Sequence, residues 1–524
     1  MSPDIEDRVA DLLGHDIRKV LRGRKVGLEK ESLRVATDGG IAQTPHPAGL
    51  GSALTHPNIT TDYSEALLEL VTPPFSDFSD TLQFLDDTHR FVYSQLDNEI
   101  LWSTSMPCVV EGDASIRLAQ YGTSNAAQMK TTYRRGLGHR YGRMMQAIAG
   151  VHFNYSYPDE FWALYQSVVG DDRERGEFVS EAYIGMIRNL LRVGWLVPYL
   201  FGASPAICAS FLGASPTTLE KWQKYSYYGP YATSLRVGDI GYQNSKEGKA
   251  GIRVDYNSLQ VYVDCLTYAI NTPNPEYEKI GLCRDGKWQQ LNTNILQIEN
   301  EHYSSVRPKQ ILQGEEKPTL ALARRGVAYI ELRSLDVNVF EPHGITEEHM
   351  RFLESFLLYS LLTPSPPFAD GDLAEIQHNL NIVADRGRDP ELKLRNAGKE
   401  VRLRDWAHDI LDNMAAGCEL LDAEGEKPVY CPALQQQRAK VADADLTPSA
   451  RVLSEMADNK EEFYHFSLRK SQQHQQWFAE HPLSAEKQAR FEQVARESID
   501  RQKAIEAADD ISFETFLDNY FSQS

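Results

Sequence analysis

Cysteine is scarce in this sequence, and the few cysteines are scattered. No two of them form a CxxC pair, so their spacing indicates neither a zinc site nor a redox motif. Six cysteines in 524 residues are also too few for a disulfide framework, and a reducing cytoplasm fits them best. The six positions are Cys108, Cys208, Cys265, Cys283, Cys418 and Cys431.

Four widespread catalytic motifs are missing as well. The sequence has no GxxxxGKS/T, no HExxH, no GxSxG and no GxGxxG after a strand. P-loop, zincin, serine-hydrolase and Rossmann enzymes therefore lose support as function classes.

Positive charge is in deficit, and an uninterrupted apolar run is lacking. There are 54 Lys and Arg against 74 Asp and Glu, a formal charge of -20, which disfavours nucleic acid and anionic lipid as partners. The amino terminus is acidic and has no apolar core of a signal peptide. The most apolar stretch, 184–212, is interrupted by Arg188, Arg192 and Pro198, so we expect a core helix there and no membrane span.

Helical and strand-like periodicities are mixed along the chain, which predicts an α+β protein. Gly- and charge-rich stretches at 241–252 and 304–320 predict surface loops. A Pro-rich segment after Thr363 separates an expected catalytic body, 1–360, from a mostly helical addition, 361–524. Helical spacing is found at 5–22, 80–98, 158–170, 180–200, 256–270 and 345–362.

Four short segments alternate like strands and place acidic, histidine or arginine side chains on one face. Residues two apart on a strand point the same way, so 27–35 brings Glu29 and Glu31 together. In the segment that begins at Glu65, the same alternation puts Glu65 and Glu69 on one face, and Asp62 lies just before this segment. In 150–156 it aligns His152, Asn154 and Ser156 against an apolar face, and in 328–335 it aligns Glu331 with Arg333.

Any one of these segments could be an antiparallel strand with its polar face in water. The four faces together concentrate Glu, Asp and His with hardly any lysine, which is unusual for a solvated face. Two carboxylates about 5 Å apart repel by roughly 3 kcal/mol at an effective dielectric near 20, so a cluster of them requires protons or cations. Magnesium, or manganese in its place, binds carboxylate oxygens and leaves positions for phosphate.

A second group of residues is aromatic and basic. Tyr133 and Arg134 are adjacent, Arg236 lies six residues before Tyr242, and Tyr303 follows an acidic segment. Arginine is the expected partner of an α-carboxylate because it binds one bidentately. Taken singly, each tyrosine could equally belong to the core or the surface.

Several longer blocks resemble the glutamate-cysteine ligases of the proteobacterial type. They cover about the first 340 residues, in the family's order. The blocks begin at Gly27 (GLEKESLRV), Leu54 (LTH), Thr61 (TDYSEALLE), Met106 (MPC), Ala119 (AQYGTSN), Gly150 (GVHFN), Pro198 (PYLFGASPA), Leu296 (LQIENE) and Tyr329 (YIELRSLD).

This resemblance implies a glutamine-synthetase-like fold, in which a curved, mainly antiparallel sheet forms a funnel with helices packed outside. It implies a cytoplasmic enzyme, expected to be a monomer, whose partners are glutamate, cysteine and ATP and whose product begins glutathione synthesis. ATP would phosphorylate the γ-carboxylate of glutamate, and the amine of cysteine would displace phosphate.

The resemblance also implies roles for individual residues. Two or three magnesium ions would be held by Glu29, Glu31, Asp62, Glu69, His152 and Glu331. Arg333 would contact phosphate and, with Glu331, carry the catalysis. The substrate pocket would be lined by Tyr63, Tyr133, Arg134, Leu137, Gln146, Ile148, Arg236, Tyr242 and Tyr303. Tyr63 stands where relatives are expected to have phenylalanine, so the aromatic wall is kept.

Three alternatives to this function remain open at the level of sequence. A related ligase could use another amine as acceptor. The carboxylates could support metal-dependent hydrolysis without ATP, or the protein could be a non-catalytic acidic binding protein.

Overall fold

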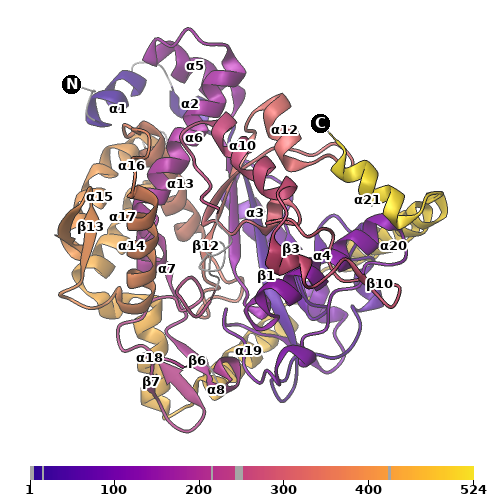
Figure 1. Cartoon of the computed structure of the whole chain (residues 1–524). Helices are drawn as coiled ribbons and strands as arrows, with labels where there is room; N and C mark the ends of the chain where they lie inside the picture. Colours follow the sequence, from indigo (N-terminus) through magenta and orange to yellow (C-terminus); the bar gives the residue numbers. More distant parts are fainter. Residues whose placement is uncertain (1–4, 14–16, 214–215, 242–251, 423–426, 524) are drawn as a thin grey trace.

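The structure is a computed structural model that describes residues 5–13, 17–213, 216–241, 252–422 and 427–523. It confirms the α+β class: a central antiparallel sheet is surrounded by helices (Figure 1). The main sheet has seven strands in the order β11-β12-β5-β1-β3-β2, with β4 paired to β1. These strands are β1 (Lys25–Ala36), β2 (Ile59–Thr61), β3 (Leu67–Val71), β4 (Glu99–Leu101), β5 (Val151–Ser156), β11 (Val306–Lys309) and β12 (Tyr329–Leu335).

Three small sheets lie outside the main one. They are formed by β6 (Ala206–Cys208) with β7 (Glu220–Lys221) and β8 (Ser226–Tyr228), by β9 (Cys283–Arg284) with β10 (Lys287–Trp288), and by β13 (Lys393–Asn396) with β14 (Lys399–Arg402).

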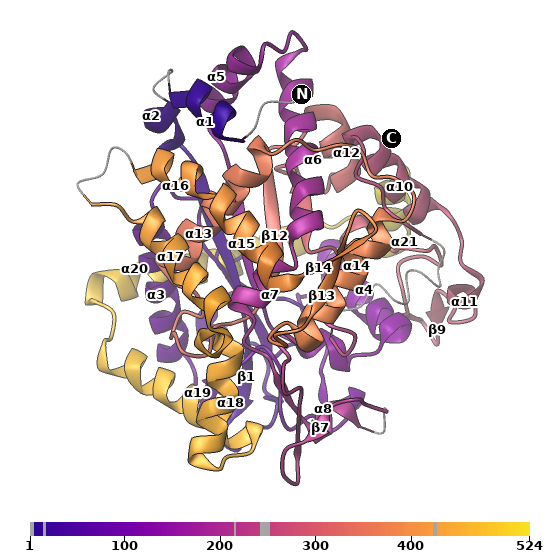
Figure 2. The same ribbon diagram turned by 90° about the vertical axis from the view of Figure 1, so that its left-hand side faces the viewer.

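The helices cover the main sheet from several sides, as the two perpendicular views in Figures 1 and 2 show. They are α1 (Ile5–Leu13), α2 (Ile17–Leu21), α3 (Phe78–Ser94), α4 (Asn125–Tyr141), α5 (Asp159–Val169), α6 (Arg175–Val193), α7 (Leu196–Phe201), α8 (Ala209–Leu212), α10 (Leu259–Asn271), α11 (Pro275–Glu278), α12 (Pro318–Arg325), α13 (Glu347–Leu362), α14 (Asp372–Arg386), α15 (Leu403–Asn413), α16 (Ala415–Asp422), α17 (Tyr430–Ala442), α18 (Pro448–Asn459), α19 (Phe463–Glu480), α20 (Ala485–Ala508) and α21 (Phe513–Phe521).

The apolar face of the main sheet is buried against helices. Leu28, Phe153 and Leu332 on this face are at most 2% exposed. Helix α3 contacts β1 and β3, and Glu354 of α13 accepts a 2.7 Å hydrogen bond from the Tyr155 hydroxyl of β5. Burying one face leaves the opposite face of the same strands for the polar side chains.

Most of the predicted elements are confirmed. The four alternating segments are β1, β3, β5 and β12, all in one sheet, and the expected long helices correspond to α3, α5, α6, α10 and α13. The stretch 184–212 runs through the end of α6, α7 and β6, and no helix in the described ranges is long and apolar enough to cross a membrane.

The prediction of a loop at 304–320 was wrong in part. Residues 306–309 form the edge strand β11, and α12 begins at Pro318. Four residues are too few to show a clear period of two. Pro308 and the charged Arg307 and Lys309 are also residue types that are common in loops. The strand forms because its backbone pairs with β12. The other predicted loop, 241–252, lies outside the described residues except at its two ends.

Helices from beyond residue 360 lie on opposite sides of the molecule. In Figure 1, α14 to α17 (orange) lie at the left and α20 and α21 (yellow) at the right. Both groups contact elements of the amino-terminal part, such as α7 beside α14 and α3 beside α20. The division at residue 360 stays a prediction.

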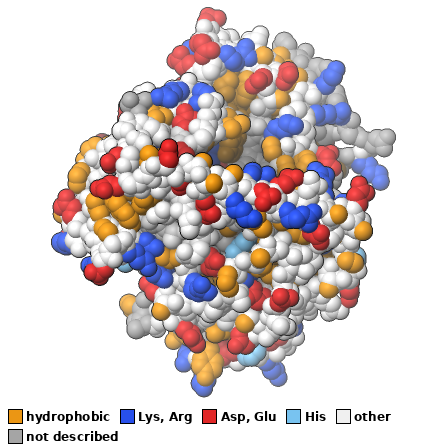
Figure 3. All heavy atoms as spheres, turned by 90° about the vertical axis from the view of Figure 1, so that its right-hand side faces the viewer, with side chains coloured by type: hydrophobic (Ala, Val, Ile, Leu, Met, Phe, Trp, Pro, Cys, Tyr) orange, Lys and Arg blue, Asp and Glu red, His pale blue; other side chains and the backbone are white. Residues whose placement is uncertain are grey.

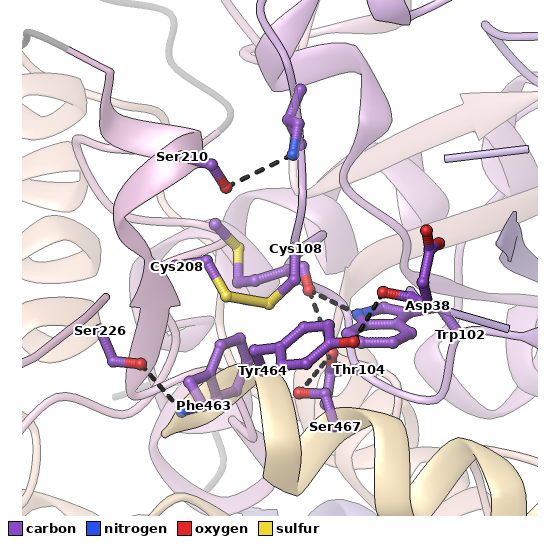
Figure 4. Close-up of a disulfide and its surroundings, with 12 residues drawn as sticks. Asp38, Trp102, Thr104, Cys108, Cys208, Ser210, Ser226, Phe463, Tyr464 and Ser467 are labelled. Atoms are coloured by element: carbon purple, nitrogen blue, oxygen red, sulfur yellow. Dashed lines mark hydrogen bonds between the residues drawn. A yellow bond between two sulfur atoms is a disulfide. The ribbon is translucent and has the colours of Figure 1, made fainter. Parts of the chain in front are cut away.

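A disulfide joins Cys108 to Cys208, which are 100 residues apart in sequence (Figure 4). This pair was not expected from the sequence, because nothing in the spacing of the two cysteines indicates that they meet. Cys108 lies in the loop after β4 and Cys208 at the end of β6, and each is at most 5% exposed. The other four cysteines are free.

Candidate active site

The polar face of the main sheet collects the side chains that the sequence singled out. Strand pairing places Glu29 opposite His152, and Glu31 opposite Glu69. On the other side of β5, Glu331 of β12 is opposite Asn154. Because cross-strand partners point to the same face, these residues form one polar patch across four neighbouring strands.

Three of these side chains form the tightest group. His152 Nδ1 lies 2.9 Å from Glu29 Oε2 and 3.7 Å from Glu331 Oε1. One ligand atom from each of the three lies within 4.8 Å of the others. Two carboxylates and an imidazole at this spacing fit a divalent cation.

Further carboxylates adjoin this group. Glu31 is 3% exposed; its Oε2 accepts a 2.6 Å hydrogen bond from the Gly150 amide, and its Oε1 is 3.8 Å from His152 Nε2. Burial, and after it Asp62, raises the pKa of Glu31. Burial, and then Glu29, Asp62 and Glu31, raises the pKa of Glu69 well above its ordinary value. The carboxylates therefore repel one another, and a cation would relieve the repulsion.

Basic residues border the acidic group on the β12 side. Arg333 Nη1 is 2.8 Å from Glu331 Oε1, and Lys309 Nζ is 3.4 Å from Glu331 Oε2. Burial opposes the charge of Glu331, but Arg333 and Lys309 hold its pKa well below the ordinary value. Arg236 donates a 2.9 Å hydrogen bond to the Arg333 carbonyl, which helps to fix the end of β12.

Two adjoining cavities meet at this patch. One, of about 230 Å³, is polar and contains all six predicted metal ligands together with Arg333. The other, of about 300 Å³, extends from Arg236 toward apolar side chains of α14 such as Leu373 and Leu380. Glu31, His152, Tyr303 and Arg333 line both. The surface is hollowed on the face shown in Figure 3, with lysine and arginine side chains beside the recess.

Most of the predicted substrate-binding residues lie at these cavities. The polar cavity is lined by Tyr63, Tyr133, Arg134, Leu137, Gln146 and Tyr303, and the larger one by Arg236. The Tyr303 hydroxyl donates a 2.9 Å hydrogen bond to Gln146 Oε1, and the Arg134 side chain donates to the Asp62 carbonyl.

One predicted residue does not line either cavity, and another is not among the described residues. Ile148 is fully buried and lines neither cavity, because the turn after Met144–Ala147 directs it into the core. Tyr242 lies outside the described residues.

Glu65 does not join the acidic group, although the alternation paired it with Glu69. Strand β3 begins only at Leu67, so the period of two does not extend back to Glu65. Its carboxylate instead accepts hydrogen bonds from the amides of His46 and Gln120.

The sequence reasoning missed three residues that line the polar cavity. Arg307 and Lys309 alternate on β11, where the sequence predicts a loop, and Asn300 precedes this strand in the chain. The spacing of Arg307 and Lys309, two residues apart, was the available signal. Asn154, which the alternation did identify, donates a 2.8 Å hydrogen bond to Glu29 Oε1.

Comparison with known proteins identifies similar chains along almost the whole length. A family model described as glutamate-cysteine ligase matches residues 9–383. A protein of Pseudomonas paraeruginosa named glutamate–cysteine ligase is 50% identical, over 94% of this chain and 93% of that protein. A protein of Alcanivorax borkumensis with the same name is 47% identical, over 99% of both chains.

Solved structures show the same architecture. A glutamate–cysteine ligase of Francisella tularensis, in complex with AMP, matches with a TM-score of 0.89 and 35% identity over 95% of this chain and 97% of that one. A bifunctional glutathione synthetase from Pasteurella multocida, 24% identical, matches in fold with a TM-score of 0.72 over 93% of this chain and 58% of that one. The fold is thus the glutamine-synthetase-like one that the sequence predicted.

Proposed function

The chain belongs to the glutamate-cysteine ligase family, and on that premise we propose that it joins the γ-carboxylate of glutamate to the amine of cysteine at the expense of ATP. The products are γ-glutamylcysteine, ADP and phosphate, the first step of glutathione synthesis. The observation that carries this proposal is the acidic and arginine-bearing sheet face at the junction of two cavities.

The reaction needs activation of a carboxylate, which is a poor electrophile because its leaving group would be oxide. Transfer of the γ-phosphoryl group of ATP to the glutamate carboxylate gives an acyl phosphate and ADP. Attack of the cysteine amine on the carbonyl carbon then forms the amide bond and expels phosphate, and the amine loses a proton. Two cavities that meet at one patch allow the phosphoryl donor and the acceptor to approach the same carboxylate.

We propose that magnesium, or manganese, binds at the acidic group. Glu29, His152 and Glu331 would hold one ion, and Glu31, Asp62 and Glu69 provide carboxylates for one or two more in the same cavity. The raised pKa of Glu31 and of Glu69 supports this, because the chain alone does not neutralise these groups. A bound ion would offset the negative charge of the polyphosphate as the phosphoryl group is transferred.

The chain's own cations have a separate role. Arg333 is held by Glu331 at 2.8 Å, so its guanidinium is a fixed positive charge for the oxygens of the transferring phosphoryl group. Arg307 and Lys309 line the same cavity and are placed to contact phosphate as well.

The aromatic and basic residues form the proposed acceptor pocket. Tyr63, Tyr133, Leu137 and Tyr303 provide an apolar wall, and Gln146 is oriented by its hydrogen bond from Tyr303. Such a wall suits a small thiol side chain and excludes water from the acyl phosphate.

A substrate panel tests the proposal. Purified protein with ATP, magnesium and glutamate is expected to release ADP faster when cysteine is added than with 2-aminobutyrate, glycine or ammonia. A preference for another amine would point to a related ligase. Product release without nucleotide would point to hydrolysis, and calorimetry without magnesium-dependent ATP binding would point to a binding protein.

We also propose that the enzyme works as a monomer in the cytoplasm. Both ATP and cysteine, the substrates of the proposed reaction, are cytoplasmic metabolites. Light scattering of the purified protein tests the first part: a dimeric mass at assay concentration would contradict it.

A further inference from the structure

The last helix of the chain packs against the helix that carries part of the proposed acceptor pocket. Figure 1 shows α21 beside α4, and the two helices contact each other although more than 340 residues separate them in sequence. Their contact is a small apolar cluster distinct from the main core, which we call the α21 cluster. Its buried members are Met129, Leu291, Phe513, Leu517 and Tyr520, each at most 9% exposed.

Tyr133 belongs to both the α21 cluster and the polar cavity. It packs against the cluster and also lines the cavity beside Arg134 and Leu137. Met129 and Tyr133 are four residues apart, so they lie on the same side of α4. The tyrosine ring is therefore held between α21 and the place where the acceptor would bind.

Polar contacts hold α21 at its start. The Asn125 amide donates to Asp509 Oδ2, and Asn125 Nδ2 donates a 3.0 Å hydrogen bond to the Ile511 carbonyl. Just before them, the Thr123 amide donates a 2.8 Å hydrogen bond to Glu506 Oε1. These contacts fix the first turn of α4 to the connection between α20 and α21.

A buried lysine holds the other end of α21. Lys317, 4% exposed, donates from Nζ to the carbonyls of Phe521 at 2.7 Å and Gln523 at 3.1 Å. A cation at the carboxyl end of a helix satisfies its last carbonyls and its dipole. Two residues on, the Thr319 amide and hydroxyl both donate to Glu299 Oε1, at the start of the segment that leads to Tyr303.

We propose that α21 is a positioning element for the acceptor pocket, with Leu517 and Lys317 as its positioning residues. Leu517 acts through Tyr133, and Lys317 acts through the 299–303 segment and Tyr303, so α21 sets the separation of two tyrosines that line one cavity. This inference rests on the proposed function, because it assigns the cavity wall to the amine acceptor.

A purely stabilising role for α21 makes a different prediction. Loss of stability alone lowers the fraction of active enzyme, and so lowers kcat without changing KM for either substrate. Displacement of Tyr133 or Tyr303 raises KM for cysteine selectively, because the proposed function assigns these two rings to the acceptor pocket.

The test compares Leu517→Ala with Phe491→Ala. Phe491 lies on α20, and its ring stacks on that of Phe91 of α3 with 5.0 Å between the ring centroids. Truncation of Phe491 therefore perturbs the same carboxy-terminal segment at a contact with α3 and not at the contact with α4. We expect Leu517→Ala to raise KM for cysteine about tenfold, because small displacements of a substrate-positioning group have effects of this size or more. KM for ATP is expected to stay within about twofold of the wild-type value. Phe491→Ala is expected to lower the melting temperature and keep both KM values.

Two further variants keep the test decisive. Leu517→Met, which fills nearly the same volume, is expected to restore KM for cysteine. Lys317→Met, which leaves the cluster intact, is expected to raise KM for cysteine in the same selective way, and it carries the test if Leu517→Ala does not fold. If both fail to fold, or if both KM values rise together, or if only kcat falls, α21 is a structural element and the proposal is overturned.

Hydrogen exchange separates this inference from the proposed function. Faster amide exchange over residues 126–137 is expected in Leu517→Ala and not in Phe491→Ala, and this readout needs no turnover. If the wild-type enzyme shows no cysteine-stimulated ADP release, the proposed function fails. If it does, but exchange in α4 is unchanged in Leu517→Ala, the positioning role fails alone.

Discussion

Glu331 links the acidic and the basic parts of the site. Its carboxylate lies 3.7 Å from His152 and also contacts Arg333 and Lys309. It can therefore serve as a metal ligand and as the anchor of the guanidinium. Glutamine has nearly the same shape but no charge, which makes it the sharpest probe of that double role.

We predict that Glu331→Gln folds normally and that kcat falls by about 100-fold or more, the usual effect of removing a charged contact to the reacting group. Circular dichroism and the substrate assay measure the two effects. Glu400→Gln on the exposed hairpin of β13 and β14 is the control and should retain activity. An unfolded Glu331→Gln protein, or unchanged turnover, would contradict the role.

Glu69 shows how the acidic group lowers the stability of the folded protein when no cation is bound. Burial and the neighbouring carboxylates raise the pKa of Glu69 well above its ordinary value. A carboxyl whose pKa is raised by folding contributes stability at low pH and loses that contribution as the pH rises through the folded-state value. At neutral pH, which lies above the ordinary pKa of a glutamate, the buried Glu69 carboxyl therefore destabilises the metal-free protein.

Glu69→Gln should consequently melt about 2 °C higher than wild type at pH 7.5 in EDTA. Adding magnesium should stabilise the wild type and have less effect on the variant. Scanning calorimetry with and without magnesium measures both. The idea fails if the variant is less stable than wild type in EDTA, or if the two respond equally to magnesium.

At the scale of elements, the strands of the site were well predicted and their neighbours were not. β1, β5 and β12 carry a period of two with unlike faces, and this pattern depends only on backbone geometry. β11 has four residues, and its identity as a strand depends on pairing with β12. Arg307 and Lys309 were missed for that reason, and Glu65 was misplaced because β3 begins two residues later than the alternation suggested.

The Cys108–Cys208 bond joins the loop after β4 to β6. It closes a chain segment of 100 residues, so it is expected to add about 4 kcal/mol to the free energy of unfolding by restricting the unfolded chain. Neither cysteine lines either of the two cavities at the candidate active site, so activity at 25 °C should not depend on the bond.

Urea unfolding of Cys108→Ser/Cys208→Ser should show the loss of stability, with ADP release unchanged. Cys283→Ser, at an exposed free cysteine, is the control and should unfold like wild type. Thiol titration of the unreduced protein in denaturing urea, which exposes the buried Cys418, should count four groups. Six reactive thiols, as a reducing cytoplasm favours, would show that the bond does not form in that compartment.

At the scale of the whole molecule, several histidines are kept neutral. Burial lowers the pKa of His56 to about 4 and of His46, His349 and His474 to about 3. The unfolded chain protonates all four near pH 6.5, so it binds more protons than the folded chain below that pH. Stability from these groups is present above pH 6.5 and is lost as the pH falls toward their folded-state values.

Unfolding near pH 5 should therefore be accompanied by the uptake of about four protons, one at each of these histidines, which appears as a fall in unfolding free energy between pH 7 and 5. Urea titrations at several pH values measure the slope. His349→Phe should reduce the uptake by about one proton, because it removes one of the four buried imidazoles. A pH-independent stability in this range would contradict the prediction.

The sequence by itself determined the chemistry of single faces and the family. Alternation placed Glu29 beside Glu31 and Glu331 beside Arg333, and the excess of carboxylates over lysines on those faces indicated a cation. Neighbouring residues on a strand are related by fixed backbone geometry, so these relations can be read without the rest of the chain.

The tertiary structure alone decided which distant segments meet. It paired Cys108 with Cys208, brought β11 to the edge of the sheet, turned Ile148 into the core and placed α21 against α4. These contacts depend on how whole elements pack, and no local period records them. Strand alternation therefore predicted the acidic sheet face, while the folded chain supplied the helix that supports Tyr133 from behind.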